Sequence, residues 1–361
     1  MKKRLLSLFL ALVMVAGLAA CAVKEAGAAQ LPVSGAGGTQ SNAVRSFTDD
    51  CGREVEIPAD ITAMVPSGPL SQIILFAIAP EMFVGLADKY GDSAKGFIPE
   101  KYFNLPFFGQ LYGSANLNVE ALAAVNPQLI IDVGEAKKST AEDMDALETQ
   151  TRIPSVHIEA SLATMPDAYR KLGSLLGKEE KGEELAQFCE KTYNRTVSIM
   201  EQVGDDKVNA LYVLGEEGLN VLANGSYHAE LFDMLTNNLA VVDNPAAKGT
   251  GNEVTPEQIA LWNPDFILFA PGSIYGTVGE QGAWKEITAV KSGNYLEVPD
   301  GPHNWMGMPP AVQRYLGLIW LTAELYPEFC DYDVKTEIME YYELFYGCTL
   351  TEDRYDSLTA H

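Results

Sequence analysis

The sequence predicts an α/β protein of two lobes, each built on a mostly parallel sheet, joined by a long helix. Three observations predict it: one phrase occurs twice, strand and helix signals alternate in both halves, and one long helical pattern lies midway. The phrase reads NVEALAAVNPQLII at 118–131 and TPEQIALWNPDFIL at 255–268, which pairs Glu120 with Glu257. Alternating strands and helices are typical of a parallel sheet covered by helices.

Each copy of the phrase predicts a short helix that turns directly into a buried strand. Asn118 and Thr255 are N-cap residues, whose side-chain oxygens accept from unpaired N–H groups at a helix start. Apolar residues then recur at helical spacing until an Asn-Pro pair, which disfavours further helix. The apolar runs that follow, at 129–131 and 266–270, indicate buried strands.

The remaining elements follow from the same signals. At 361 residues, 47% hydrophobic and 20% charged, the chain is ordinary for a globular protein and long enough for two cores. We expect a hairpin at 46–58, strands at 61–65, 83–86, 155–158, 208–214 and 294–298, and helices from 70, from 227 and at 309–325. We expect an N-terminal lobe at 46–176 and a C-terminal lobe at 204–361. The segment 177–203 connects them, and its helical pattern covers 179–203.

The N-terminus predicts export and lipid attachment. Lys2, Lys3 and Arg4 precede an apolar stretch at 5–18, which is short for a membrane span. The four residues that end the apolar stretch, Leu-Ala-Ala-Cys, resemble the lipobox of bacterial lipoproteins, in which the cysteine, here Cys21, is acylated and becomes the mature N-terminus. We therefore expect a signal peptide at 1–20 and a flexible tether at 21–45, with an ordinary cleaved signal as the alternative.

The charge balance limits the partners. The chain has a formal net charge of −24, and because the signal carries three cations and no anion, the mature chain carries −27. Such a surface argues against nucleic acid or a bare anionic bilayer as a partner. Four cysteines remain after the lipobox (Cys51, Cys189, Cys330 and Cys348), and their pairing stays open between disulfides and free thiols. Their spacing does not indicate a zinc site.

The lipobox, the hairpin TDDCGREVEIP, the paired phrases and the long central helix resemble the substrate-binding proteins that serve ABC importers for iron complexes, cobalamin and haem. The resemblance implies two Rossmann-like lobes bridged by a rigid helix, with the ligand held in a cleft that closes little. It implies an extracytoplasmic protein, lipid-anchored to the cell membrane at the cell surface or in the periplasm. The implied partners are a permease dimer and its ATPase subunits, with no cofactor beyond the transported ligand.

The same resemblance gives a role to the repeated phrase. In that family the glutamate of each phrase pairs with arginines of the permease, and those positions are Glu120 and Glu257 here. Two lobes that dock onto two permease subunits explain why the phrase occurs twice. The alternative is local, because a glutamate in the first turn of any helix is stabilised by the helix dipole.

The cleft is expected where strands end and helices begin. The candidates in loops after strands are Ser67, Ser71, Lys89, Tyr90, Lys137, Tyr227, His228, Tyr275, His303 and Trp305. The serines are interpreted as donors to an anion or as helix caps, and the lysines as partners of a ligand carboxylate or as solvated surface residues. The histidines would bind a ligand oxygen or a metal centre, or have a structural role, and the tryptophan suits an apolar cleft wall. Arg314 is expected to anchor a loop, with a position in the cleft as the alternative.

The resemblance implies a binding protein whose ligand is an iron chelate such as a siderophore, haem or cobalamin, and the candidate loops, which are aromatic and contain few cations, are compatible with such a ligand. Molybdate or tungstate is the alternative ligand, held by Ser67, helix N–H groups and His228 or His303. An exported α/β enzyme is the alternative of another class. No GxSxG, HExxH, Walker or post-strand GxGxxG motif supports catalysis.

Overall fold

The structure is a computed structural model that describes residues 43–110 and 117–360. The described residues belong to one compact unit. The predicted signal peptide, Cys21 and the tether up to residue 42 lie outside the described residues. Strand β1 begins at Val44, so residues 44 and 45, expected in the tether, belong to a sheet. Within the described ranges, no helix combines the length and the apolar character needed to cross a bilayer.

The N-terminal sheet region extends from β1 to α4. Its strands are β1 (Val44–Thr48), β2 (Glu54–Pro58), β3 (Met64–Pro66), β4 (Leu129–Gly134) and β5 (Ser155–Glu159), and its helices are α1 (Pro69–Ile78), α2 (Val119–Val125), α3 (Thr140–Thr151) and α4 (Met165–Leu176). β1 and β2 form the predicted antiparallel hairpin, and β3, β4 and β5 form a parallel sheet in that order. The strand predicted at 83–86 is wrong, because Phe83 and Leu86 make only isolated bridges.

The C-terminal sheet region extends from β6 to α11. Its strands are β6 (Asn209–Leu214), β7 (Asn220–Val221), β8 (Asn237–Asn238), β9 (Asn252–Glu253), β10 (Phe266–Phe269) and β11 (Tyr295–Glu297), and its helices are α6 (Glu230–Leu235), α7 (Pro256–Trp262), α8 (Thr288–Ser292), α9 (Arg314–Leu325), α10 (Val334–Tyr341) and α11 (Glu352–Leu358). The sheet order is β11-β10-β6-β7-β9, with β8 also beside β6. β6 pairs in parallel with β8 and β10, whereas β7 and β9 are antiparallel additions.

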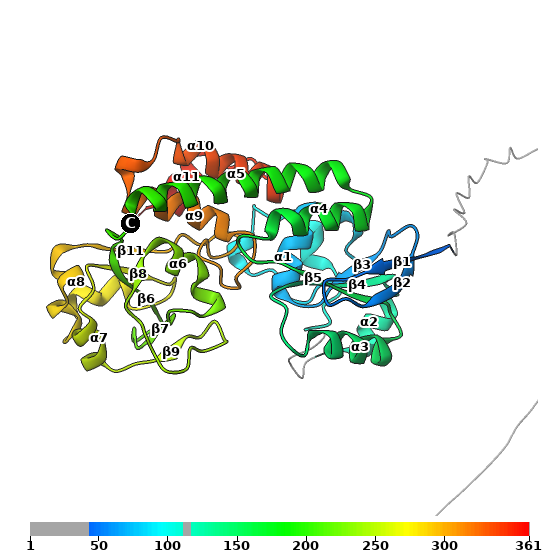
Figure 1. The fold of residues 1–361 in the computed structure, drawn as a ribbon, viewed down its shortest axis with the longest axis horizontal. Helices are drawn as coiled ribbons and strands as arrows, with labels where there is room; N and C mark the ends of the chain where they lie inside the picture. Colours follow the sequence, from blue (N-terminus) through cyan, green and yellow to red (C-terminus); the bar gives the residue numbers. More distant parts are fainter. Residues whose placement is uncertain (1–42, 111–116, 361) are drawn as a thin grey trace, which may run out of the picture. The chain divides into compact units, whose positions relative to one another are not determined.

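Helix α5 (Glu179–Val203) has the bounds that the helical pattern predicts. It packs against α4 of the N-terminal sheet region and α9 of the C-terminal sheet region, and Figure 1 shows it alongside both. Its buried face includes Leu185, Cys189 and Ile199. Because one continuous helix contacts both regions, α5 couples them mechanically. The predicted α/β architecture with a joining helix is confirmed.

The two copies of the repeated phrase have the same local structure. Asn118 accepts a hydrogen bond from the Ala121 N–H at 2.9 Å and begins α2, and Thr255 begins α7 in the same way. Asn126 and Asn263 end the two helices with left-handed φ angles of 46° and 40°, a conformation that asparagine tolerates better than most residues. β4 and β10 then follow, buried along their whole lengths.

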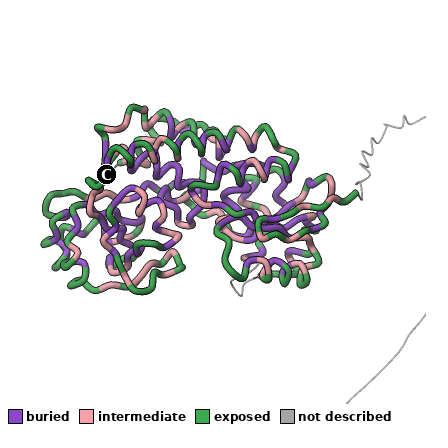
Figure 2. Tube along the Cα trace, in the orientation of Figure 1, coloured by how far each residue is buried: buried purple, intermediate pink, exposed green. Residues whose placement is uncertain are grey.

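The core corrects two expectations in the C-terminal half. Trp305 is not a cleft wall: it is fully buried, packs edge-on against Trp320 and donates from Nε1 to the Tyr342 hydroxyl at 3.2 Å. Helix α9 begins at Arg314 and not at 309, and Pro310 disfavours helical backbone at residue 309. Figure 2 shows buried segments gathered in the interior of both sheet regions, with exposed segments around them. The four described cysteines are free thiols.

Candidate functional site

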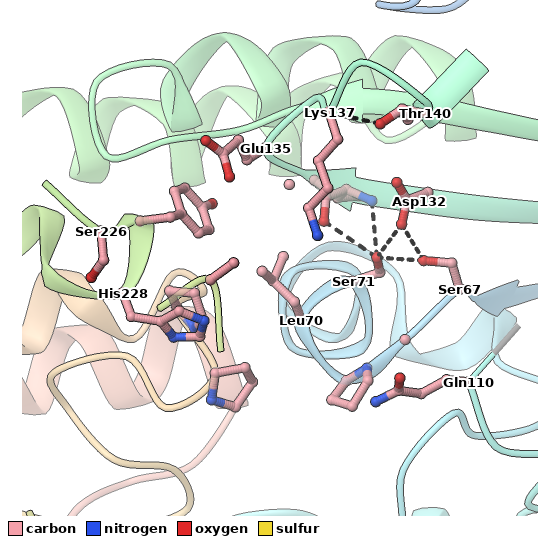
Figure 3. A pocket seen from close by; sticks show the side chains of 18 of the residues that line it. Ser67, Leu70, Ser71, Gln110, Asp132, Glu135, Lys137, Thr140, Ser226 and His228 are labelled. Carbon is pink, nitrogen blue, oxygen red and sulfur yellow. Dashed lines mark hydrogen bonds between the residues drawn. The ribbon is translucent and has the colours of Figure 1, made fainter. Parts of the chain in front are cut away.

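A cavity of about 480 Å³ lies between the two sheet regions, within the usual size range of small-molecule pockets (Figure 3). The N-terminal sheet region contributes Ser67, Gly68, Pro69, Leu70, Ser71, Gln110, Asp132, Val133, Gly134, Glu135, Lys137 and Thr140. The C-terminal sheet region contributes Gly225, Ser226, Tyr227, His228, Pro245, Ala246, Ala247, Pro309 and Pro310. Most of the first set follow β3 and β4, at the strand ends where parallel sheets commonly bind ligands.

Helix α1 begins at the cavity. Its N-cap residue, Gly68, has no side chain, and no side-chain cap satisfies the first turn. The unpaired N–H groups of a first turn bear partial positive charge. Leu70 and Ser71 belong to this turn and line the cavity, so this end of α1 favours oxygen atoms of a ligand.

Asp132 lies beside Ser67 and Ser71, and the three residues line one side of the cavity, called its floor below. The Ser67 hydroxyl donates to its Oδ1, and Ser71 Oγ lies 3.4 Å from the same oxygen. The other carboxyl oxygen lies 2.6 Å from Nδ1 of His157. All four side chains are buried, with Asp132 only 6% exposed and His157 fully buried. These hydrogen bonds offset the cost of burying a carboxyl group.

The opposite wall is formed by the segment 225–228. The Tyr227 hydroxyl donates to the Ala160 carbonyl oxygen at 2.9 Å, and Ser226 accepts from the Ala229 N–H at 3.2 Å. Burial lowers the pKa of His228 below its usual value, so the imidazole is neutral at neutral pH. A neutral imidazole offers a ligand one donor and one acceptor.

Little positive charge lines the cavity. Lys137 is the only lysine or arginine among its described lining residues, and Figure 3 shows its ammonium group directed into the cavity. Glu135 and Asp132 line the same cavity. Arg314 lies close behind Tyr227, with its guanidinium 5.1 Å from the ring centroid, but pairs with Glu230 at 2.6 Å. Arg314 therefore anchors helix α6 to α9, whereas the sequence predicted that it would anchor a loop.

The predicted cleft residues separate into three groups. Ser67, Ser71, Lys137, Tyr227 and His228 line the 480 Å³ cavity together. Lys89, Tyr90 and His303 line a smaller cavity of about 200 Å³, which shares two prolines, at 69 and 309, with the first. Tyr275 packs against the rings of Phe269 and Tyr295, and, like Trp305, lines neither cavity.

Sequence reasoning missed several lining residues. Gln110, Asp132, Thr140 and the segment 245–247 were not predicted, and neither was the contact of His157 with Asp132. One signal was available: Asp132 interrupts the apolar run LIIDVG of β4, where a carboxyl group needs a buried partner. Its partners Ser67, Ser71 and His157 lie just after β3, in α1 and in β5, so only the folded sheet brings them to Asp132.

The paired glutamates lie away from the cavity. Glu120 and Glu257 are exposed in the first turns of α2 and α7. Large apolar side chains are exposed beside them, with Val119 38% exposed and Leu261 78% exposed. Figure 1 shows α2 and α7 on the side of the sheets opposite α5. Both helices therefore present a carboxylate beside apolar surface.

Two α/β sheet regions joined by a helix, with a ligand-sized cavity between them, define a solute-binding protein. Residues 111–301 match the model of the family described as "Periplasmic binding protein", and the chain belongs to this family. The predicted family is thereby confirmed. The members of this family to which the chain is similar are solute-binding proteins of ABC transporters and not enzymes.

The chain is similar to relatives with different ligands in their names. It is 26% identical over 346 residues to the molybdate-binding protein MolA of Haemophilus influenzae, covering 86% of this chain and 93% of the relative. It is 24% identical over 315 residues to the iron(3+)-hydroxamate-binding protein FhuD of Bacillus subtilis, covering 82% and 90%. A solved ABC transporter solute binding protein from Sulfurospirillum deleyianum is 25% identical, with a TM-score of 0.79 over 87% of this chain and 98% of that structure.

Proposed function

We propose that the protein is an extracytoplasmic, lipid-anchored carrier that captures an iron chelate of the siderophore, haem or cobalamin kind and delivers it to an ABC importer. The observation that carries this proposal is a cavity of about 480 Å³ whose described lining residues include a single lysine and no arginine. At ~30 Å³ per water, this volume equals about 16 water molecules. A bare tetraoxo anion has the size of a few waters and would leave most of the space solvated, whereas an organic chelate fills it.

The charges support a ligand of low net charge. Lys137 is opposed in the lining by Glu135 and Asp132, so little positive charge is available to compensate a dianion. The first turn of α1 supplies N–H donors for ligand oxygens, such as those of a hydroxamate or a carboxylate. Similarity to FhuD supports a chelate with such oxygens.

A second candidate ligand is molybdate or tungstate. Similarity to MolA supports this candidate, and the uncapped first turn of α1 is a general binding feature for oxyanions. Lys137 and a neutral His228 would complete the donor set on either side. The argument against an oxyanion is that Glu135 and Asp132 oppose the charge of Lys137 in the cavity lining.

Delivery requires attachment and docking. In this proposal Cys21 carries the lipid, and Glu120 and Glu257 pair with cationic side chains of a permease dimer that works with ATPase subunits. The exposure of both glutamates supports this role, as does the exposed apolar surface at Val119 and Leu261. Charged groups at the rim of an interface mainly set association rate and orientation.

The test is a direct ligand comparison with the full chain. Native mass spectrometry of the purified protein would detect any co-purified cargo. Calorimetric titration would then compare a ferric trihydroxamate, haem, a corrinoid, molybdate and tungstate. We expect a one-to-one complex with one of the organic metal complexes, recovered chemically unchanged. Binding of an oxyanion alone would replace the ligand assignment, and chemical conversion of the ligand would contradict the carrier role.

A further inference from the structure

The two serines on the cavity floor have one hydroxyl proton each, and every acceptor found for these protons lies inside the protein. The Ser67 hydroxyl donates to Asp132 Oδ1. The Ser71 hydroxyl has three acceptors within reach: Ser67 Oγ at 2.9 Å, the Val133 carbonyl oxygen at 3.3 Å and Asp132 Oδ1 at 3.4 Å. Its own oxygen accepts from the Val133 N–H at 2.9 Å. Both protons therefore point away from the cavity.

His157 fixes the orientation of the carboxyl group from below. With Asp132 as a carboxylate, Nδ1–H of His157 donates to Oδ2 at 2.6 Å, while Oδ1 accepts from the serines. His157 lies on β5, directly opposite Asp132 in the β4–β5 register, and is fully buried. His157 thus holds the carboxylate of its neighbour on β4 in the orientation in which it accepts from Ser67 and Ser71.

We propose that Asp132 determines the ligand specificity of this cavity by holding the hydroxyl protons of Ser67 and Ser71 inward. The floor then offers the ligand only oxygen lone pairs, backed by a negative charge. The ligand that fits carries N–H or O–H donors, or a positive charge, on the part that reaches Ser67 and Ser71. This inference rests on the proposed carrier function and narrows its substrate class to organic metal complexes with such donors.

The rest of the cavity has the opposite polarity. Lys137 and the first turn of α1 offer donors, and Figure 3 shows the Lys137 ammonium group directed into the cavity. A chelate with oxygen atoms at one end and amide or hydroxyl groups at the other matches both polarities. A tetraoxo dianion carries no protons at neutral pH, so at the floor its oxygens would meet the lone pairs of Ser67 and Ser71 and the charge of Asp132.

The test compares two probes in four proteins. The probes are a linear ferric trihydroxamate with free amide N–H groups, and tungstate. The proteins are the full wild-type chain, Asp132→Asn, Ser67→Ala and the control Asp143→Asn. Asp143 is a matched control because it also accepts from a serine, Ser139, at 3.0 Å, but on the surface of α3 and outside the cavity lining. Calorimetric titration measures each affinity, and circular dichroism melts establish that each variant is folded.

The expected pattern follows from the proton positions. Ser67→Ala removes an acceptor and lowers the affinity for the trihydroxamate by about tenfold. Asp132→Asn removes the charge, and its amide N–H donates to the serine oxygens, which releases hydroxyl protons toward the cavity. That variant loses affinity for the trihydroxamate and gains about tenfold or more for tungstate. Asp143→Asn behaves as wild type with both probes. Tight tungstate binding by wild type that Ser67→Ala weakens tenfold would overturn the proposal, because the serine would then be a donor.

A ligand-free measurement separates this proposal from the carrier function. The chain contains only four histidines, so ¹⁵N-labelled histidine gives an NMR spectrum that single substitutions can assign. We expect Nδ1 of His157 to carry a proton in wild type and in Asp143→Asn, and its resonance to shift in Asp132→Asn. An unprotonated Nδ1 would place the proton on Asp132 and overturn the proposal even if a chelate binds. A protonated Nδ1 with no binding of either probe would support the floor polarity and contradict the proposed ligand class.

Discussion

The hydroxyl of Tyr227 donates a 2.9 Å hydrogen bond to the carbonyl oxygen of Ala160, which joins the two sheet regions. Ala160 directly follows β5, and two residues later Leu162 makes two more contacts with the C-terminal sheet region. Its N–H donates to Glu230 at 3.2 Å, and its carbonyl oxygen accepts from the Tyr315 hydroxyl at 2.6 Å. Three side chains thus hold one short segment, which favours a cavity that changes little on ligand binding.

The Tyr315 contact is expected to contribute more stability than the Tyr227 contact. Tyr315 is fully buried, so Tyr315→Phe leaves the Leu162 carbonyl oxygen without this donor, and the free energy of unfolding should fall by about 1–3 kcal/mol. Tyr227→Phe removes a partly buried bond while its ring keeps the contact with Arg314, and the loss should be about 0.5–1.5 kcal/mol. Urea unfolding of both variants checks the order. Equal stabilities of Tyr315→Phe and wild type would contradict it.

The pair formed by Arg314 and Glu230 is expected to be structurally essential. Arg314 is fully buried and bonds Glu230 at 2.6 Å, so Glu230→Gln leaves a buried guanidinium without its counterion. We expect the free energy of unfolding to fall by about 2–3 kcal/mol. The matched control is Glu183→Gln, which breaks the exposed pair with Arg170 and should leave the unfolding curve almost unchanged. A smaller loss in Glu230→Gln than in the control would contradict the anchoring role.

The sequence predicts well those elements whose signals are local. The repeated phrase contains its own N-cap and its own Asn-Pro stop, so both helices and the strands after them are correctly placed. Helix α5 repeats its apolar positions over 25 residues and needs no tertiary information. The segment 83–86 has an apolar pattern but gains no full strand partner, so pattern alone gave a wrong strand.

The site is less predictable because its residues depend on pairings between distant segments. Ser67 was a candidate because it follows a strand, but its hydroxyl direction depends on Asp132, which is 65 residues away in the chain. Trp305 has the composition of a cleft wall, yet the position of Trp320 places it in the core. The position of a residue relative to the strand ends helped to predict which residues line the cavity, whereas the sequence does not show how their side chains are oriented.

His303 is expected to make stability depend on pH. Burial lowers its pKa in the folded protein to about 4, from about 6.5 when exposed. Between these values the unfolded chain binds the proton more readily, so acidification from pH 6.5 toward 4 lowers the free energy of unfolding, and above 6.5 the effect is absent. Over this whole range the loss should be about 3 kcal/mol.

The variant His303→Gln isolates this contribution. Burial also lowers the pKa of His228 and raises that of Asp300, which contributes with the opposite sign, but both groups are present in the variant and in wild type. The difference between the two pH profiles from chemical denaturation therefore reports His303. We expect wild type to lose more stability than the variant between pH 7 and 5. Parallel profiles would show that the folded protein does not resist protonation of His303.

Charge reversal of the paired glutamates is expected to separate ligand capture from delivery. Glu120→Lys with Glu257→Lys places repulsive charges where the proposal expects permease arginines, so uptake should fall about tenfold or more. Ligand affinity should not change, because neither residue lines the cavity. Each single variant should have a smaller effect, since two contacts that form together reinforce each other. Transport into cells or proteoliposomes, with calorimetry of the same proteins, measures both quantities.

The control reverses the same number of charges on another helix. Glu179→Lys with Glu180→Lys alters the exposed first turn of α5, which Figure 1 shows on the opposite side from α2 and α7. If docking uses the glutamates of α2 and α7, this control transports normally although its net charge equals that of the test variant. Equal loss of uptake in both double variants would instead show that overall charge governs association. In that case the repeated glutamates would have only the role that any first-turn carboxylate has, which is to stabilise its helix.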